Sequence, residues 1–298
     1  MSLHVLVTGA GGFSGAFLTT ALLSRGYRVT AVAGSARGRL PDDAESKGNL
    51  QVIRGDLSAG LALPADIDAV VHAAARSAWP GVSTDELVRA NVLATRNLIA
   101  HAVRTGVGTF ILFSSLSVHG RIQSTVVDQS TPVLDPDAYG LTKRLCEQML
   151  AAATGPMRGL AIRLPGILGP GSVRNWMTTT LAAAKEGRDI TVFDPNAAFN
   201  NAVHIADIAN FVDGLLGRDW QGFDAGPLGA SGLTNAGAVA KLLADAGGGR
   251  STIRVDATPR QSYTISSDWA CQRYGYAPME ITAMLQRFIA ENRALKPD

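Results

Sequence analysis

The chain opens with an apolar run that ends in a glycine cluster, Val5-Leu-Val-Thr-Gly-Ala-Gly-Gly-Phe-Ser-Gly15. The run predicts a buried strand, and the segment from Ala16 to Gly26 predicts a helix that starts inside the cluster. Gly9, Gly12 and Gly15 follow the spacing G-x-x-G-x-x-G. Glycines between a strand and a helix allow a tight turn and a close approach of the backbone to a pyrophosphate. The stretch therefore predicts dinucleotide binding, with a plain tight loop as the alternative.

Strands and helices alternate along the next part of the chain. Short β-rich runs predict strands at Arg28–Ala33, Gln51–Arg54, Ala69–Ala73, Thr109–Phe113 and Gly159–Leu164. Helical periodicity marks Asp85–Thr105 and Ala138–Ala153 between them. Such alternation predicts an α/β fold of the Rossmann type, a doubly wound parallel sheet covered by helices on both faces.

The pattern loosens past Leu164, where helices are predicted at Trp176–Glu186, Ile205–Leu216 and Glu280–Asn292. We expect residues 1–165 to form the dinucleotide-binding domain, with a returning segment near 203–226. Residues 166–298 would mostly form a smaller C-terminal substrate-binding lobe. In open α/β sheets a ligand binds beyond the carboxyl ends of the strands, so we expect the lobe to close over a substrate there.

Composition narrows the class of protein. Of the 298 residues 17% are charged, and the net charge of +2 gives no reason to expect a nucleic-acid partner. Cys146 and Cys271 are isolated thiols without metal-ligand spacing, so we expect a reducing cytoplasm and no structural metal. Val5–Ser24 carries no charge, but glycines, threonines and serines interrupt it. Neither a signal peptide nor a membrane span is expected.

Tyr139 and Lys143 stand four residues apart in the predicted helix Ala138–Ala153. Positions i and i+4 of a helix share a face and lie about 5–6 Å apart at Cβ. The ammonium of Lys143 would therefore lower the pKa of the Tyr139 phenol from about 10 toward neutrality, where a general acid–base works best. The alternative is an exposed helix on which the pair is incidental.

These motifs resemble the extended short-chain dehydrogenase/reductase family, within it the NAD-dependent epimerase/dehydratase group. The resemblance covers nearly the whole chain, and its specificity comes from the order and spacing of modest motifs. They are Thr8-Gly-x-x-Gly-x-x-Gly15, Gly55-Asp-Leu57, Val71-His-Ala-Ala-Ala75, Asn91-Val-x-Ala-Thr-x-Asn97, Phe113-Ser-Ser-x-x-Val-x-Gly120, Tyr139-x-x-x-Lys143 and His204-Ile-Ala-Asp207.

The resemblance implies a catalytic Ser115, whose hydroxyl would hold the substrate oxygen beside Tyr139. Tyr139 would pass a proton to or from that oxygen, and Lys143 would also bond the nicotinamide ribose. A hydride would move between the substrate carbon and the nicotinamide. Two alternatives stay open: Ser115 as a cap of the loop after its strand, and Asn91 as either a holder of backbone near the site or a simple helix contact.

The resemblance also implies a cofactor-binding set. Asp56 would contact adenine, with an N-cap as its competing role, and Leu57 would pack against the ring. Alanines after the fourth strand would let the cofactor lie against it, although buried core alanines look the same. His72 and His204 are expected to be hydrogen-bonded structural histidines. The full set is Gly9, Gly12, Phe13, Ser14, Arg37, Asp56, Leu57, Ala73, Ala74, Ala75, Tyr139, Lys143 and Pro165.

The end of the second strand bears on the choice between NAD and NADP. Relatives that prefer NAD place an acid there for the ribose 2′-OH. This chain has Ala33 and Gly34, followed by Ser35, Arg37 and Arg39, which could bind a 2′-phosphate. NADP is therefore favoured over NAD, with a solvated basic loop as the alternative.

Two departures from the family concern the substrate. Gly166 and Asn200 stand where nucleotide-sugar members usually have Asn and Arg, which bind the sugar and the diphosphate. Three cations either replace these lost contacts or are surface charges, namely Arg174, Lys185 and Arg260. The first hypothesis is an NAD(P)-dependent epimerase, dehydratase or reductase of a secondary alcohol or ketone in a sugar or nucleotide sugar. The second is an NADPH-dependent ketone reductase of a non-sugar substrate, and the third is a non-catalytic NADP-sensing regulator.

A homodimer is also expected. Relatives commonly pack the Tyr139 helix and the helix after the fourth strand into a four-helix bundle. The apolar faces for it would come from residues that a monomer core would equally need, namely Val92, Leu98, Val103, Leu145 and Met149.

Overall fold

A computed structural model describes residues 2–34, 40, 48–153, 155–258 and 260–294. The chain divides into two compact units. The first unit comprises Met1–Arg121, Pro132–Arg163 and Ala209–Gly226. The second comprises Ile122–Thr131, Leu164–Ile208 and Pro227–Asp298.

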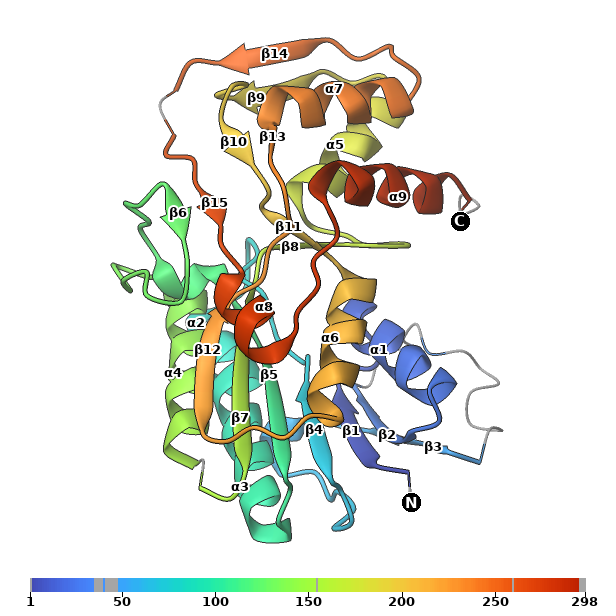
Figure 1. The fold of residues 1–298 in the computed structure, drawn as a ribbon, viewed down its shortest axis with the longest axis vertical. Helices are drawn as coiled ribbons and strands as arrows, with labels where there is room; N and C mark the ends of the chain where they lie inside the picture. The colour runs from blue at the N-terminus through green and yellow to red at the C-terminus, as the bar shows by residue number, and fades with distance from the viewer. Residues whose placement is uncertain (1, 35–39, 41–47, 154, 259, 295–298) are drawn as a thin grey trace. The chain divides into compact units, whose positions relative to one another are not determined.

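A seven-stranded sheet forms the first unit (Figure 1). Its strand order is β12-β7-β5-β4-β1-β2-β3. β1 pairs in parallel with β2 on one side and with β4 on the other, so the order reverses between β1 and β4. In doubly wound sheets such a reversal is where a ligand binds. The strands are β1 (His4–Thr8), β2 (Arg28–Ala33), β3 (Leu50–Arg54), β4 (Ala69–His72), β5 (Thr109–Ser115), β7 (Arg158–Leu164) and β12 (Phe223–Pro227).

The predicted helix Asp85–Thr105 is continuous but changes type along its length. It begins as α2 (Thr84–Leu87), passes through a π-helical segment, η3 (Val88–Leu93), and continues as α3 (Ala94–Thr105). Such π segments are frequent at functional sites. The other elements between the strands are α1 (Phe13–Ser24), η2 (Leu57–Ala59), η4 (Leu116–His119), α4 (Ala138–Ala153) and α6 (Ile205–Leu216).

Helices cover both faces of this sheet. Leu6, Val70 and Phe110 pack into one core cluster with Leu98 of α3 and Leu150 of α4. Figure 1 shows α1 and α6 together on the other face. The Arg25 guanidinium after α1 donates a 2.7 Å hydrogen bond to the Ala209 carbonyl of α6, and Tyr27 donates one of 2.8 Å to Asp213. The predicted Rossmann-type fold is therefore confirmed.

Burial separates the residues that were expected to supply a dimer face. Val92 and Leu98 are 8% and 1% exposed, so both belong to the core of the monomer. Val103 and Leu145 are 56% and 48% exposed, as is Leu141 at 55%. An exposed apolar pair on α4 therefore lies one turn apart at Leu141 and Leu145.

The second unit is built from short strand pairs and four helices within the described ranges. The helices are α5 (Trp176–Lys185), α7 (Ala236–Ala246), α8 (Asp268–Tyr274) and α9 (Ile281–Ala294). Its core includes Leu181, Leu243 and Phe288. Throughout the described residues, every helix is too short or too polar to span a bilayer. The strands pair as β8 (Gly166–Leu168) with β11 (Ala202–His204), β9 (Ile190–Phe193) with β14 (Ile253–Asp256), β10 (Ala198–Phe199) with β13 (Thr234–Asn235), and β6 (Val126–Val127) with β15 (Thr264–Ile265).

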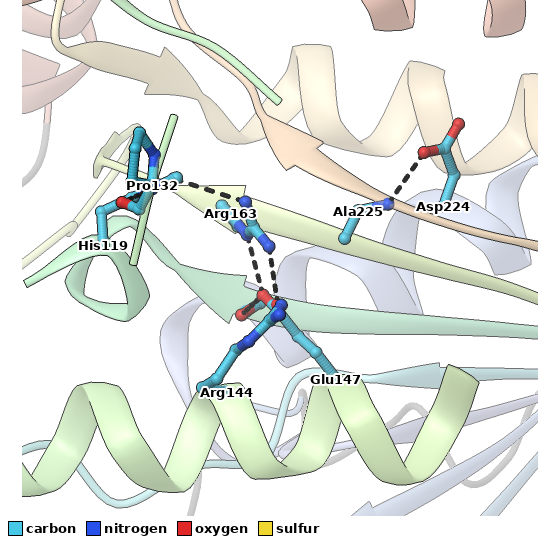
Figure 2. A network of polar contacts seen from close by, with 8 residues as sticks. His119, Pro132, Arg144, Glu147, Arg163, Asp224 and Ala225 are labelled. Atoms are coloured by element: carbon cyan, nitrogen blue, oxygen red, sulfur yellow. Dashed lines mark hydrogen bonds and ion pairs between the residues drawn. The ribbon is translucent and has the colours of Figure 1, made fainter. Parts of the chain in front are cut away.

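A buried ion cluster fixes α4 to the sheet of the first unit. Glu147 is 0% exposed, and Figure 2 shows its carboxylate between Arg163 of β7 and Arg144 of its own helix. Arg163 donates two hydrogen bonds of 3.0 and 2.8 Å, and Ser114 of β5 donates one of 2.6 Å. Burial alone would raise the pKa of Glu147, but Arg163, Ser114 and Arg144 hold it below its ordinary value. The carboxylate thus stays charged and joins α4 to two strands.

We predict that Glu147→Ala lowers the free energy of unfolding by about 3–5 kcal/mol, because Arg163 is left buried without its counter-charge. Urea denaturation followed by circular dichroism measures this. Glu186→Ala is the matched control, since Glu186 pairs with Arg188 on the surface, where both are about 60% exposed. That change should cost less than about 1 kcal/mol. Equal losses for the two variants would contradict the role given to the buried cluster.

Candidate active site

The turn between β1 and α1 is closed so tightly that only glycine fits at two positions. Gly9 has φ +71°, and a Cβ there would lie 2.8 Å from the amide nitrogen of Ala74. A Cβ on Gly15 would lie 2.2 Å from the carbonyl oxygen of Gly9. α1 begins at Phe13 with Gly12 as its N-cap, and no side chain caps it. The positive end of its dipole is therefore left for an anionic group such as a pyrophosphate.

A cavity of about 420 Å³ lies beside this turn, within the range of small-ligand pockets. Five residues of the predicted cofactor set line it: Gly9, Asp56, Leu57, Ala74 and Ala75. The cavity is also lined by three residues with little or no side chain, Gly34, Gly55 and Ala90. The glycine turn, the uncapped helix and this cavity together fit a dinucleotide.

Asp56 takes the N-cap role that was the alternative to adenine contact. It caps η2, accepting hydrogen bonds from the amide and hydroxyl of Ser58 at 2.8 and 2.7 Å. Its other oxygen accepts from Arg89 at 2.9 Å. The hydrogen bonds from Ser58 come first among the causes that hold the pKa of Asp56 below its ordinary value. Because Asp56 also lines the cavity, the adenine contact stays a prediction.

Several predicted residues are placed but not given a role by the geometry. Gly12, Phe13 and Ser14 stand at the start of α1, and Ala73 contributes backbone that approaches Gly9. Pro165 directly follows β7 and falls within the second unit. Arg37, on which the choice of NADP rests, lies outside the described residues together with Ser35 and Arg39.

The pKa of Tyr139 is the main correction to the expectations from sequence. Lys143 was expected to lower it, but burial raises it, with only partial relief from a hydrogen bond to Ser115. The charged phenolate loses hydration inside the protein, and Asp137 and Cys146 raise the pKa further, so the effect of Ser115 is outweighed. Lys143 is itself 2% exposed, and burial lowers its pKa while Cys146 and Glu147 oppose that change. The phenol is therefore protonated at neutral pH in the protein alone.

Ser115 combines the two roles that were weighed for it. It is the N-cap of η4, accepting a 3.1 Å hydrogen bond from the amide of Ser117. Its hydroxyl donates a 3.1 Å hydrogen bond to the Ser117 hydroxyl and lies close enough to Tyr139 to lower the pKa of that phenol. The structure thus brings Ser115 and Tyr139 together, with Lys143 one turn along the same helix as Tyr139.

Asn91 in the π-helical segment holds backbone near this group, as one of its two predicted roles required. Its side-chain oxygen accepts a 2.7 Å hydrogen bond from the amide of Arg76, after β4. Its side-chain nitrogen donates to the Arg76 carbonyl at 3.0 Å and to the Thr142 hydroxyl at 3.1 Å. Asn91 therefore ties the cavity wall after β4 to the helix that carries Tyr139 and Lys143.

His72 is a structural histidine, as predicted. Thr95 donates to the Asn91 carbonyl at 2.6 Å, so it accepts from Nε2–H of His72 at 2.9 Å. Nδ1 of His72 then accepts from the Thr8 hydroxyl at 2.6 Å, and that hydroxyl accepts from the Ala74 amide at 3.2 Å. Burial, followed by the charge of Lys143, lowers the pKa of His72 to about 3. His204 is likewise buried and bonds Glu291 at 3.0 Å.

The second unit contains a separate cavity of about 340 Å³ with aromatic walls. Trp176 packs edge-on against Phe199 with ring centroids 5.6 Å apart, and the Arg260 guanidinium lies 3.4 Å from the centroid of Phe193. Tyr263 and Asn201 also line it. Sequence reasoning missed Phe193, Tyr263 and Asn201 as site residues, because nothing local sets them apart from core or loop.

Asn200 and Gly166 stand where the family usually grips a sugar nucleotide. Asn200 is fully used as a structural tie, donating to the Ala230 and Ile265 carbonyls and accepting from the Ile265 amide. A Cβ on Gly166 would lie 3.1 Å from that of Asn175, so a larger residue there would need a shift. Of the cations named as substitutes, Arg260 lines the cavity, while Lys185 donates to the Asn292 carbonyl.

Comparisons with known proteins bear on the family and the fold of the chain. A family model described as the NAD dependent epimerase/dehydratase family matches residues 5–222. A 2-alkyl-3-oxoalkanoate reductase of Stenotrophomonas maltophilia is 33% identical over 226 residues, 70% of this chain but only 64% of that protein. A dTDP-glucose 4,6-dehydratase of Streptomyces griseus is 25% identical over 93% of this chain and 90% of its own. The solved structure of MoeE5 in complex with UDP-glucuronic acid and NAD has a TM-score of 0.80 at 25% identity, covering 97% of this chain and 99% of that one.

We predict that Gly15→Ala weakens NADH binding at least tenfold and lowers the free energy of unfolding by about 1–3 kcal/mol, because its methyl group has no space beside Gly9. Isothermal titration calorimetry and thermal denaturation measure the two effects. Gly214→Ala in α6 is the control, since a Cβ there meets no atom within 4 Å. It should leave binding unchanged and gain up to about 1 kcal/mol from helix propensity. Unaltered NADH binding by Gly15→Ala would refute the assignment of the turn to the cofactor.

Proposed function

Because the chain belongs to the NAD dependent epimerase/dehydratase family and is an enzyme of that class, we propose that it oxidises or reduces a secondary alcohol or ketone of a nucleotide sugar through Ser115, Tyr139 and Lys143. One observation carries the proposal. Tyr139, paired with the Ser115 hydroxyl, sits one helical turn before the buried cation of Lys143. The relatives reported above are enzymes, so the alternative of a non-catalytic sensor has no support from them.

Each residue has a stated task in this proposal. Ser115 holds the substrate oxygen by a hydrogen bond, which places that oxygen at the phenol of Tyr139. Tyr139 is protonated at neutral pH and is ready to donate in the direction of reduction. For oxidation it must lose that proton, and the charge of Lys143 favours the phenolate as it forms. The nicotinamide, when bound, supplies or takes up the hydride.

The aromatic cavity of the second unit supports a nucleotide as part of the substrate. Trp176, Phe193, Phe199 and Tyr263 offer ring surfaces of the kind that stack with a base, and Arg260 offers a cation for phosphate. A relative of known structure binds UDP-glucuronic acid, and another relative is a dTDP-glucose dehydratase. We therefore prefer UDP- or dTDP-linked sugars over free sugars.

A second candidate function is the reduction of a non-sugar ketone. The reductase of Stenotrophomonas maltophilia, named for 2-alkyl-3-oxoalkanoates, favours it. So does Asn200, which is a structural tie where nucleotide-sugar enzymes usually have an arginine. Turnover of a 2-alkyl-3-oxoalkanoate, with none of any UDP- or dTDP-sugar, would select this candidate.

A homodimer remains part of the proposal. Leu141 and Leu145 form an exposed apolar pair on α4, and Val103 is exposed on α3. Burial of these side chains against a second copy would remove apolar surface from water.

We predict that Tyr139→Phe lowers turnover of the reactive substrate by at least about a hundredfold, since general acid–base catalysis contributes about 10²–10⁴-fold. NADH binding should stay within about twofold of the wild type. Steady-state assays with a panel of UDP- and dTDP-sugars measure the first quantity and calorimetry the second. Tyr27→Phe, which removes a phenol bonded to Asp213, is the control and should keep full turnover. Retention of most turnover by Tyr139→Phe would defeat the assignment.

We propose NAD as the cofactor, in place of the NADP that the sequence favoured, because the solved relative holds NAD and the family is described as NAD dependent. We predict tighter binding of NADH than of NADPH in competition titrations at fixed salt concentration. Arg37→Ala should change neither affinity by more than about twofold. Tighter binding of NADPH that Arg37→Ala abolishes would restore the expectation from sequence.

A further inference from the structure

A second cavity of the first unit contains none of the proposed catalytic residues. Its volume is about 240 Å³, and its apolar wall consists of Leu57, Leu61, Leu63 and Leu98, so we call it the leucine pocket. An apolar cavity of about 150 Å³ is enough to hold a benzene molecule. The leucine pocket therefore has room for a short hydrocarbon chain, and no step of the proposed reaction uses it.

Arg104 of α3 is an exposed residue that lines the leucine pocket without a counter-charge. Its Nη2 donates a 3.2 Å hydrogen bond to Nδ1 of His101, and Nε2 of that ring donates one of 3.0 Å to the Pro64 carbonyl. Burial lowers the pKa of His101, so the ring is neutral and can accept from Arg104. Among the described residues Arg104 forms no ion pair. Its guanidinium is thus held in place with most of its N–H donors left for a ligand.

An apolar pocket beside an unpaired cation fits a small carboxylate with a short apolar chain. The chain would cover Leu61 and Leu63, which are only partly buried by the fold. The guanidinium would bind the carboxylate through parallel N–H···O bonds. Arg104 also lies in the last turn of α3, where the helix dipole opposes an anion. A singly charged carboxylate therefore suits the pocket better than a phosphate, which carries more negative charge.

The leucine pocket shares a wall with the cavity assigned to the dinucleotide. Leu57 lines both cavities. Leu61 packs against Gly55 of the dinucleotide cavity, where a Cβ would lie 2.7 Å from its Cδ1. The side chain of Asn97 in α3 donates to the carbonyls of Leu57 and Ser58 at 3.0 and 3.1 Å. A ligand that packs on Leu57 and Leu61 stabilises this segment in the conformation that forms the cavity wall.

We propose that the leucine pocket is a regulatory site for a small carboxylate with a short apolar chain, and that its occupation tightens binding of the dinucleotide. The chain packs on the leucines, and Arg104 binds the carboxylate. Because coupling between two sites is reciprocal, bound NADH tightens binding of the carboxylate by the same factor. The regulatory role rests on the proposed dinucleotide site, whereas the carboxylate site does not.

The carboxylate site is tested with hexanoate, titrated into the full chain without NADH and followed by heteronuclear NMR. The amide signals that shift should be those around the leucine pocket, such as Gly60 and Leu61. Acetate keeps the charge without the chain and should bind at least about tenfold more weakly. Hexanamide keeps the chain without the charge and should bind at least about threefold more weakly, as should hexanoate to Arg104→Gln. Arg254→Gln, which changes an exposed arginine of the second unit, is the control and should bind hexanoate normally.

The regulatory role is tested by titrating NADH with and without saturating hexanoate, followed by NADH fluorescence. NADH should bind at least about threefold more tightly with hexanoate, and acetate at the same concentration should have no effect. Hexanoate binding with an unchanged NADH affinity would overturn the regulatory role.

The remaining outcomes separate the carboxylate site from the proposed function. Equal binding of hexanoate and hexanamide, or of hexanoate to the wild type and to Arg104→Gln, would overturn the carboxylate site. Circular dichroism shows whether Arg104→Gln is folded, and hexanamide with the wild type decides alone if it is not. Failure of NADH to bind while hexanoate binds would overturn the proposed function together with the regulatory role, and the carboxylate site would stand.

Discussion

The contact between Gly15 and the carbonyl of Gly9 is the constraint on which the first unit depends. A side chain at position 15 would start only 2.2 Å from that carbonyl oxygen, so α1 can sit this close to β1 only with glycine. The same closeness brings Gly9 against the backbone of Ala74 after β4. Three segments thereby meet where the strand order reverses. Gly9 and Ala74 both line the cavity beside this contact.

Helix α4 carries two buried charges one turn apart that are treated differently. Glu147 has hydrogen bonds from Ser114, Arg144 and Arg163, so its burial is compensated within the fold. Lys143 has no hydrogen bond to any described residue, although it is 2% exposed. Proteins depart from full satisfaction of polar groups mainly at functional sites. The contrast assigns Glu147 to stability and agrees with the role proposed for Lys143 at the active site.

Much of the first unit could be predicted from the sequence, because its strands are apolar runs and its helices are long. β2 and α4 have the predicted bounds, and the helix predicted at residues 85–105 begins one residue earlier and contains a π-helical segment. The seventh strand, β12, was not predicted, since Phe223–Pro227 contains glycine and proline and little periodicity. In the second unit α7 and α8 were missed, as were strands of two to four residues that have no recognisable pattern.

The positions of the candidate site residues could be predicted from their spacing, but the electrostatics around them could not. Spacing alone placed Tyr139 and Lys143 on one face, whereas the burial that raises the pKa of Tyr139 depends on distant segments. Nor does the sequence distinguish Asn200 from Asn201, since only the packing of Ile265 shows which one is used structurally.

A chain of hydrogen bonds runs from the Ala74 amide through Thr8, His72 and Thr95 to the Asn91 carbonyl. Each hydroxyl both accepts and donates, so the protons have a single arrangement and His72 a single tautomer. With a pKa of about 3, that imidazole takes up no proton anywhere near physiological acidity. The backbone beside the predicted dinucleotide site therefore keeps the same hydrogen bonds when the pH becomes moderately acidic or alkaline.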